Sequence, residues 1–253
     1  MTDQLESAPG PVPTHPATAG DASRPGGRRV RLRRMREADL DFVVDQHLEH
    51  FPQGFFARLG RGFLREYYRG FLTGPAASTT VAELDGRAVG YLVGVTRPRC
   101  QRDHLLRRHG RGLVVRAATA MLRRPWLALL FLRTRAVRYG RKLLERLRPS
   151  PAGPGAPSAV VGVLTHVAVE ESAQCEGIGT CLVDRFEAEA AAVGCERLVL
   201  VTASGERGAG RFYRRRGWCA VGDHCTPDGQ ALTTFELTLA DDEQGPGPAA
   251  GTE

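Results

Sequence analysis

Apolar residues in the middle of this chain recur with two different periods, and each period predicts one kind of element. The β-branched run at 164–169 predicts a buried strand, and the apolar positions after residue 177 recur at helical spacing. A second apolar run at 197–202 predicts a further buried strand. A strand, a helix and a strand in this order form a right-handed unit whose two strands are parallel. The residues that share the helical face are Leu182, Val183, Phe186, Ala190 and Val193.

Similar patterns on both sides of this unit predict the rest of a sheet with helices around it. Asp85–Gly86 lies between two β-like runs, which is a strong hairpin signal. After a break at Phe51-Pro52, an aromatic stripe from Phe55 to Leu72 has helical spacing, and we expect it to be core. Further strands are predicted at 30–34, 79–83, 88–94, 218–221 and 232–239, and further helices near 36–48 and at 209–216.

A long segment, 97–158, separates the third predicted strand from the fourth. Two helices are predicted in it, and Pro125 suits the first turn of the second. Residues 97–148 contain sixteen Arg or Lys but only two acids, a balance of +14 that exceeds the +7 of the whole chain. The simplest interpretation is a solvated arginine face on a helical pair that packs over the sheet edge.

Three functional interpretations of this insertion stay open: a lid over an acceptor pocket, a patch for an anionic substrate or nucleic acid, and a basic amphipathic surface that lies on membranes. Among them we favour the lid. One side of the second helix is apolar, so it can dock on the sheet while the arginines stay outside. The apolar positions on that side are Leu129, Leu132, Ala136, Leu143 and Leu147.

Composition places the chain among globular proteins. Of its 253 residues 42% are hydrophobic, and we expect one domain at 29–240 between disordered tails at 1–28 and 241–253. No apolar run approaches the length of a membrane span and no secretory signal is present, so we expect a cytoplasmic protein. Arginine is abundant while Lys142 is the only lysine, which suggests a GC-rich bacterial genome. The six cysteines lack C-x-x-C pairing and are expected to be reduced packing residues rather than metal ligands.

The loop at 174–180, Gln-Cys-Glu-Gly-Ile-Gly-Thr, joins the strand at 164–169 to the helix. Gly177 and Gly179 let a ligand approach the backbone closely. Unpaired N–H groups and the positive end of the helix dipole converge at this point. We therefore expect the loop to bind an anion such as a diphosphate.

Two blocks of the chain together resemble the acyl-CoA-binding signature of the GNAT superfamily of N-acetyltransferases. The first is Gln174-x-x-Gly177-x-Gly179, and the second is Ala209-x-x-Phe212-Tyr213-x-x-x-Gly217-Trp218. The resemblance implies an α/β (α+β) fold with a mixed, mostly antiparallel central sheet flanked by helices, here with a helical insertion between strands 3 and 4. It also implies transfer of an acetyl group from acetyl-CoA, the co-substrate, to a primary amine.

The resemblance also implies roles for particular residues. Tyr213 matches the tyrosine that reaches the cofactor sulfur, and it is our candidate acid for the departing thiolate. The segment Phe51–Phe56 would form one wall of the acceptor site as well as core. The pantetheine arm would pair with backbone groups of the strand, where an amide also steadies the oxyanion, and the loop amides would hold the diphosphate. The expected cofactor-binding residues are Val167, Ala168, Val169, Gln174, Cys175, Glu176, Gly177, Ile178, Gly179, Thr180 and Tyr213.

The base that would take a proton from the amine is left open. Thr165 and His166 alternate on the strand, so only one can face the cleft. The motif register favours Thr165, whereas His166 has a near-neutral pKa that suits proton transfer. A histidine that is merely packed is the simpler interpretation of His166. Glu83 is a second catalytic candidate, and a water chain is a third.

Three residues depart from the family pattern. Cys175 stands where a glycine is common, Glu171 where a proline is common, and Glu206 where an asparagine often contacts the cofactor. Diphosphate binding survives at Cys175 if its φ is negative, because the backbone amide is then intact. Glu206 places a negative charge near the cofactor and puts that one contact in doubt.

We therefore expect an acetyl-CoA-dependent N-acetyltransferase that acts on a small molecule or a peptide, with no metal and with a homodimer left open. The competing hypothesis is a basic binding module, for nucleic acid or a membrane surface, on a catalytically degenerate acetyltransferase fold. Nucleic acid is disfavoured because the insertion lacks interleaved stacking aromatics. The sequence does not identify the amine acceptor.

Overall fold

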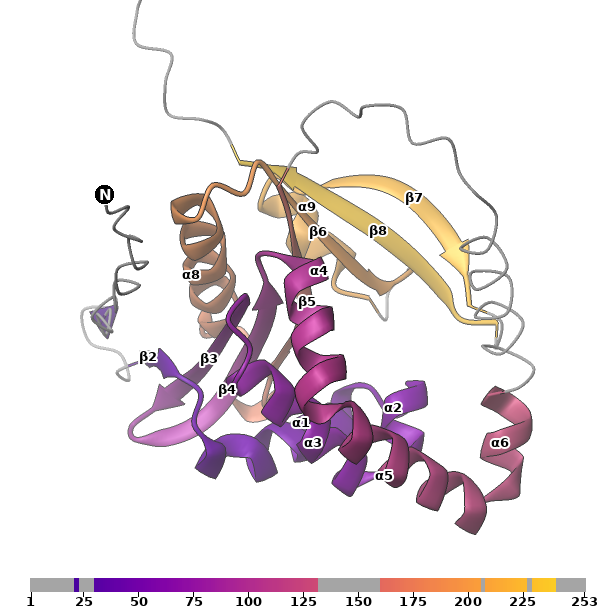
Figure 1. Cartoon of the computed structure of the whole chain (residues 1–253). Coiled ribbons are helices and arrows are strands. Elements are labelled where there is room, and N and C mark those ends of the chain that lie inside the picture. The colour runs from indigo at the N-terminus through magenta and orange to yellow at the C-terminus, as the bar shows by residue number, and fades with distance from the viewer. Residues whose placement is uncertain (1–20, 23–29, 132–159, 206–207, 227–228, 240–253) are drawn as a thin grey trace, which may run out of the picture.

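One mixed β-sheet runs through the protein (Figure 1). The computed structural model describes residues 21–22, 30–131, 160–205, 208–226 and 229–239. Neighbouring strands are antiparallel except β5 and β6, which are parallel, so the predicted mixed and mostly antiparallel sheet is confirmed. The strands, in sheet order, are β1 (Asp21–Ala22), β2 (Val30–Arg34), β3 (Ala77–Leu84), β4 (Arg87–Val95), β5 (Val161–Val169), β6 (Arg197–Ala203), β8 (Ala231–Thr238) and β7 (Cys219–Cys225).

Helices cover both faces of this sheet (Figure 1). One face carries η1 (Glu37–Asp39), α1 (Leu40–His50), α2 (Phe55–Arg58), α3 (Arg61–Leu72) and α5 (Gly110–Arg123). The other carries α8 (Ile178–Ala192), and α9 (Gly210–Arg215) packs on the same side. The remaining helices described are α4 (Pro98–His104), η2 (Leu105–His109), α6 (Pro125–Phe131) and η4 (Glu171–Ala173).

Each face of the sheet has its own hydrophobic core, as the predicted helical faces require. Four of the five residues predicted on the apolar face of α8 have no exposed surface. The fifth, Val193, is 47% exposed because α8 ends one residue before it. The hydrophobic core between the sheet and α8, which we call the α8 core, continues to α9 and β8 through Tyr213, Trp218 and Phe235.

The predicted aromatic stripe forms two helices rather than one. α2 ends at Arg58 and α3 begins at Arg61, because Gly60 between them has a φ of +89° that a continuous helix does not allow. The aromatic side chains still converge on the sheet. Those of α3 that are buried are Phe63, Tyr67, Tyr68 and Phe71.

The insertion leaves the sheet after β4 and returns at β5. Its two ends meet, because Val95 of β4 pairs directly with Val163 of β5. The described part is helical, as predicted, and α6 begins at Pro125. Leu129, which we expected to dock on the sheet, is 59% exposed. The other four positions expected to dock lie outside the described residues.

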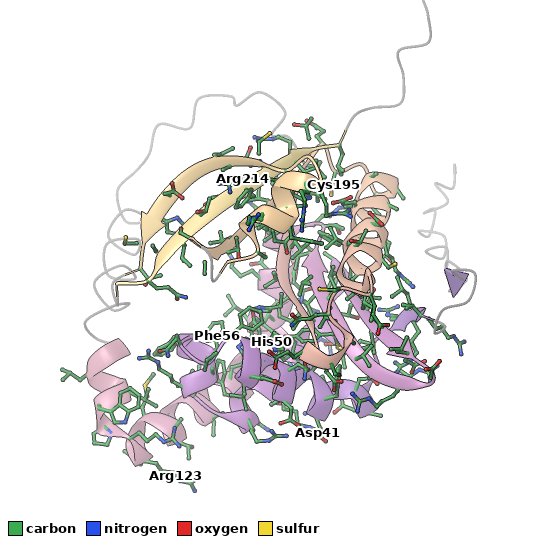
Figure 2. All side chains as sticks on the ribbon, turned by 180° about the vertical axis from the view of Figure 1, so that it is seen from behind. Asp41, His50, Phe56, Arg123, Cys195 and Arg214 are labelled. Atoms are coloured by element: carbon green, nitrogen blue, oxygen red, sulfur yellow. The ribbon has the colours of Figure 1, made fainter. Side chains whose placement is uncertain are left out.

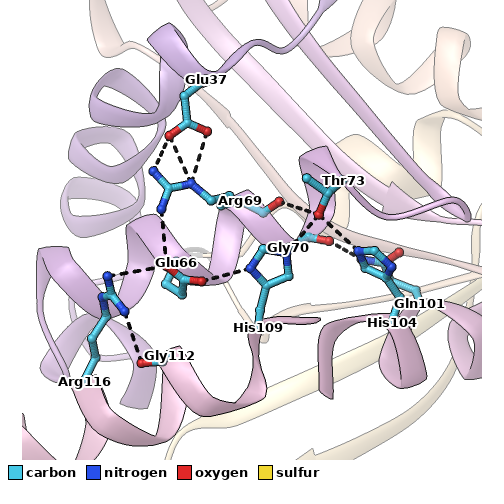
Figure 3. Close-up of polar contacts among 10 residues, drawn as sticks. All are labelled: Glu37, Glu66, Arg69, Gly70, Thr73, Gln101, His104, His109, Gly112 and Arg116. Atoms are coloured by element: carbon cyan, nitrogen blue, oxygen red, sulfur yellow. Dashed lines mark hydrogen bonds and ion pairs between the residues drawn. The ribbon is translucent and has the colours of Figure 1, made fainter. Parts of the chain in front are cut away.

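Polar contacts, drawn in Figure 3, fix the insertion to α3, and apolar packing adds to them. His109 Nδ1 lies 2.9 Å from a carboxylate oxygen of Glu66, and Arg116 pairs with the same carboxylate at 3.5 Å. Gln101 Nε2 donates to the carbonyl of Gly70 at 2.9 Å. One side of α5 is therefore held against α3. The apolar side chains of the insertion that pack on this core are Leu105, Leu113, Ala117, Ala120 and Met121.

The cysteines are more exposed than we expected for packing residues. Only Cys195 is buried, and Cys181 is intermediate. All six thiols are free, and the described residues contain no cluster of three or more side chains able to hold a metal ion. The interpretation as packing residues is wrong for the four exposed ones, Cys100, Cys175, Cys219 and Cys225.

Some predictions concern residues outside the described part of the chain. They include the tail at 241–253, most of the tail at 1–28, the insertion beyond Phe131, and Glu206. Asp21–Ala22, within a tail that we expected to be disordered, pairs with β2 as a short strand. Among the described helices, none is long and apolar enough to cross a membrane.

Candidate active site

The parallel pairing of β5 and β6 stops halfway along both strands. Val161–Leu164 pairs with Arg197–Leu200, and beyond that point β6 pairs only with β8. The second half of β5, Thr165–Val169, keeps β4 as its neighbour, and no strand in the described part of the chain pairs with its other side. Five residues of β5 therefore present an open edge, which spans about 13 Å at the usual rise per residue.

Alternation along β5 decides which backbone groups face this opening. Glu170 N–H donates to the carbonyl of Val89 on β4 at 2.7 Å, so every second residue before it also turns its backbone groups to β4. The N–H and C=O groups of Val167 and Val169 then face the opening. The carbonyl of Val169 is already occupied, because His50 Nε2 donates to it at 3.0 Å and Gln174 Nε2 at 3.2 Å.

A β-bulge at Thr165 shifts the alternation of side chains between the two faces of β5. Val93 pairs with His166 and Gly94 with Leu164, so Thr165 is one residue more than β4 can match. In a regular strand Leu164 and His166 would share a face. The bulge instead leaves Leu164 in the α8 core and turns His166 toward α1 and α3. We expected only one of Thr165 and His166 to face the cleft, because neighbouring residues alternate on a regular strand. The strand is not regular at the bulge, so that argument does not apply to these two residues.

His166 lies in a cluster of aromatic rings on the α1–α3 side of the sheet. Its ring centroid is 5.1 Å from that of His47, and the hydroxyl of Tyr67 is 3.5 Å from its Nε2. Behind it, His47 Nδ1 lies 2.7 Å from the hydroxyl of Tyr68, which lies 2.9 Å from the hydroxyl of Tyr91. The other rings around His166 are Phe51 at 5.7 Å and Tyr68 at 5.8 Å.

Our sequence reasoning missed His47, Tyr68 and Tyr91 as members of a site. A signal was present for His47, because it follows Val43 and Val44 at helical spacing and therefore points to the core. A histidine on an apolar face must find a polar partner. No such signal could have named Tyr68 as that partner.

Desolvation by this cluster lowers the pKa of both histidines. The pKa of His166 falls to about 3, first through desolvation and second through the neighbouring His47, and the pKa of His47 falls to about 4 through desolvation. This differs from the near-neutral pKa that we expected for His166. At neutral pH both imidazoles are uncharged, and each has one ring nitrogen able to accept a hydrogen bond. Burial also raises the pKa of the hydroxyls of Tyr67, Tyr68 and Tyr91.

The glycine loop forms a concave backbone site at the start of α8. Cys175 and Gly177 have φ values of +66° and +79°, while Glu176 between them has a negative φ. Alternation of this kind turns successive N–H groups toward one point and makes an anion-binding nest. The first turn of α8 adds unpaired N–H groups and the positive end of a 15-residue helix.

Cys175 does not meet the condition of a negative φ that we set for diphosphate binding. Its φ of +66° lies in the left-handed region, which favours glycine, the residue that is common at this position in the resembled family. A non-glycine residue in the left-handed region costs about 1 to 2 kcal/mol. The amide of Cys175 nevertheless belongs to the nest, so the strained backbone keeps the loop suited to an anion.

A shallow depression of about 520 Å³ lies between the start of α8 and α9. Thr180, Phe212, Arg215 and Arg216 line it. The guanidinium of Arg216 is occupied by acidic partners on α8, whereas the exposed Arg215 makes no ion pair with any residue of the described part. Arg215 therefore leaves a positive charge beside the glycine loop.

The structure places the two remaining catalytic candidates in different surroundings. Tyr213 on α9 is 5% exposed beside Trp218, and its hydroxyl has no hydrogen-bond partner among the described residues. Burial raises the pKa of Tyr213 to about 12, so its hydroxyl stays protonated at neutral pH. Glu83 forms an ion pair with Arg33 at 2.6 Å, across the β2–β3 pairing. At this point β3 pairs with the end of β4 that is remote from His166. Glu83 does not belong to the His166 cluster.

Comparison with known proteins identifies this combination of elements. Residues 138–218 match the family model described as Acetyltransferase (GNAT) family. The matched range includes β5, the glycine loop, α8, β6 and α9, which together build the open edge and the anion site. Comparison with curated proteins finds no match.

Solved structures extend the likeness to most of the chain. Ard1 from Thermoplasma volcanium has a TM-score of 0.51 at 13% identity, covering 84% of this chain and 99% of its own. NAA60 from Arabidopsis thaliana in complex with acetyl-CoA has a TM-score of 0.51 at 12% identity, covering 83% and 98%. An aminoglycoside 6′-N-acetyltransferase complexed with coenzyme A has a TM-score of 0.51 at 13% identity, covering 84% and 99%. At such identities the likeness concerns the fold, and it agrees with the match of residues 138–218 to the GNAT acetyltransferase family.

Proposed function

We propose that this protein is an acetyl-CoA-dependent N-acetyltransferase whose acceptor is a primary amine of a small molecule or a peptide. The observation that carries the proposal is the continuity of the site. The open edge of β5 begins beside the anion-binding nest and ends at His166. A ligand with a diphosphate at one end and a reactive thioester at the other fits that arrangement.

The cofactor would be held by backbone groups and by Arg215, which makes no ion pair with any described residue. The nest from Cys175 and the first turn of α8 to Thr180 bind the diphosphate, and Arg215 is placed to meet a phosphate group. The N–H and C=O groups of Val167 pair with amides of the pantetheine arm. At Val169 only the N–H group is free for the cofactor, because His50 and Gln174 occupy its carbonyl.

Acetyl transfer forms a C–N bond and breaks the C–S bond of the thioester. A backbone N–H on the open edge of β5 stabilises the oxyanion of the tetrahedral intermediate. Tyr213 donates its proton to the departing thiolate, for which its protonated hydroxyl is suited. The proton that the amine loses passes to water.

In this mechanism His166 acts as a neutral hydrogen-bond acceptor rather than as a strong base. With a pKa of about 3 it cannot hold the proton of an ammonium group, so the acceptor must arrive as the free amine. A hydrogen bond from the amine to the imidazole then points the nitrogen lone pair at the thioester. Glu83 takes no part, because it is paired with Arg33 away from the cluster.

A screen for thiol release with acetyl-CoA and a library of amines tests the function. Product formation should require Tyr213 and the glycine loop. As the pH rises, kcat/KM should rise with deprotonation of the acceptor ammonium group, with no step near pH 6.5. His166→Ala should lower kcat/KM about tenfold or more at unchanged coenzyme A affinity, and His166→Gln should restore part of it. A protein that binds acetyl-CoA yet acetylates no amine would instead support the competing hypothesis of a binding module on a degenerate fold.

A further inference from the structure

The outer side of the insertion carries a concentration of exposed apolar side chains. Of the ten large apolar side chains that are exposed in the described residues, six lie between Leu106 and Leu129. Val114, Val115 and Leu122 on α5 are 68%, 62% and 88% exposed. The six residues, which we call the apolar face, are Leu106, Val114, Val115, Leu122, Trp126 and Leu129.

The three members of this face on α5 lie together. At about 100° per residue, Val114, Leu122 and Val115 fall within an arc of about 100°. The opposite side of α5 packs, through Leu113 and Ala117, on the hydrophobic core that α3 forms with the sheet. The exposed arc therefore points away from the protein, and the contacts of Figure 3 hold it in that direction.

Unpaired arginines accompany the apolar face. Residues 98–131 contain eight arginines and only one acid, Asp103. The two arginines of this stretch that do form ion pairs are Arg102 and Arg116. The exposed arginines without an ion pair to any described residue include Arg107, Arg108, Arg111, Arg123 and Arg124.

We infer that the apolar face and its arginines rest on an anionic membrane surface. Apolar side chains that enter the acyl boundary, flanked by arginines that meet lipid phosphates, are the features of an interfacial helix. Trp126, 51% exposed, suits the boundary between headgroups and acyl chains. The insertion would bind on the membrane without crossing it.

Two other occupants fit the same face less well. A second copy of the chain in a two-fold contact would bring these arginines opposite themselves, which like charges oppose. Nucleic acid would pair with the arginines but would leave the exposed aliphatic side chains in water. Only a surface that is both anionic and apolar matches the two components together.

This placement leaves the active site accessible. Figure 2 shows Arg123, at the end of α5, far from Arg214 on α9. The anion-binding loop and α9 are on the other face of the sheet from α5. Acetyl-CoA could therefore reach its site from water while the insertion is on the membrane.

Tryptophan fluorescence offers a direct test with the full chain. The protein has two tryptophans, of which Trp218 is 2% exposed in the core and Trp126 is on the apolar face. Vesicles of phosphatidylcholine with 30% phosphatidylglycerol should shift the emission to the blue, and Trp126→Phe should abolish the shift. Absence of a shift at physiological salt would overturn the inference.

Sedimentation with the same vesicles separates the contributions of charge and apolar contact. Each arginine changed to glutamine among Arg107, Arg111, Arg123 and Arg124 should weaken binding about fivefold. The triple variant Val114→Ser, Val115→Ser, Leu122→Ser should also lose binding. Arg31→Gln with Arg34→Gln, and Val193→Ser with Val221→Ser, are matched exposed controls that should bind as the parent does.

The same variants decide against the inference if another partner is correct. Binding to DNA that is lost in the arginine variants but unaffected by the serine variant would assign the face to nucleic acid. A parent that sediments as a dimer, and a serine variant that sediments as a monomer, would assign it to self-association. Equal binding of parent and variants to vesicles would show that the membrane contact lies elsewhere. Circular dichroism and coenzyme A binding confirm that each variant is folded.

Discussion

Two histidines that stay uncharged in the folded protein should make its stability sensitive to mild acid. The pKa of His47 is lowered to about 4 and that of His166 to about 3, whereas both titrate near about 6.5 in an unfolded chain. Below about pH 6.5 the unfolded state therefore binds more protons than the folded state. The stability that these groups contribute is present above about pH 7 and is lost as the pH falls toward their folded pKa values.

The size of the effect follows from these pKa values. Between pH 7.5 and pH 5.5, each histidine should lower the free energy of unfolding by about 1.4 kcal/mol, or about 2.7 kcal/mol together. Glu37 does not contribute in this window, because its hydrogen bond to Arg69 lowers its pKa and confines its effect on stability to more acidic pH.

Urea unfolding at the two pH values measures this difference. His47→Phe and His166→Phe should each reduce the loss on acidification by about 1.4 kcal/mol, because each removes one titrating group but keeps an aromatic ring. His224→Phe, at an exposed position on β7, is the control and should retain the full loss. A parent equally stable at both pH values, or phenylalanine variants that lose as much as the parent, would refute the linkage to this cluster.

Three further predictions concern the cofactor site. Gly177→Glu should weaken coenzyme A binding at least tenfold in calorimetry, because it places a carboxylate in the nest at a residue with φ of +79°. Gly222→Glu, on the exposed strand β7, is the control and should have no effect. Equal coenzyme A affinities of Gly177→Glu and the parent would contradict the site. Tyr213→Phe should lower turnover about 10²-fold at nearly unchanged cofactor affinity, and full turnover with chemistry rate-limiting would show that water protonates the thiolate. Cys175→Gly should raise the free energy of unfolding by up to about 1 kcal/mol, since relief of the left-handed strain exceeds the entropy cost of glycine, while Cys175→Ala should bring no such gain.

Local sequence patterns predict most of the strands and helices of the fold. Periodicity located the strands and the α8 helix, and Asp85–Gly86 correctly predicted the β3–β4 hairpin. These features depend on residues near one another in sequence, so a single sequence contains them. The exposure of Cys219 and Cys225 was not predictable in this way, because it depends on β7 being an edge strand.

The candidate site shows where sequence reasoning reaches its limit. The glycine spacing alone indicates an anion site, but the positive φ of Cys175 is contrary to the local preference of a non-glycine residue. The bulge at Thr165 depends on how β4 matches β5, and neither strand shows it alone. The low pKa of His166 likewise arises from rings contributed by α1 and α3, which are about a hundred residues earlier in the chain.

The direct pairing of Val95 with Val163 makes the β4–β5 junction a place where chain length is almost free to vary. Both ends of the insertion are held together by the sheet itself, so each doubling of its length adds only about 0.6 kcal/mol of closure entropy. A related protein could lose, extend or exchange this segment while the strands, the nest and the His166 cluster stay in register. Loss of the segment would expose the apolar α3 surface that Leu105, Leu113 and Met121 now cover, so that surface would need another cover or polar substitutions.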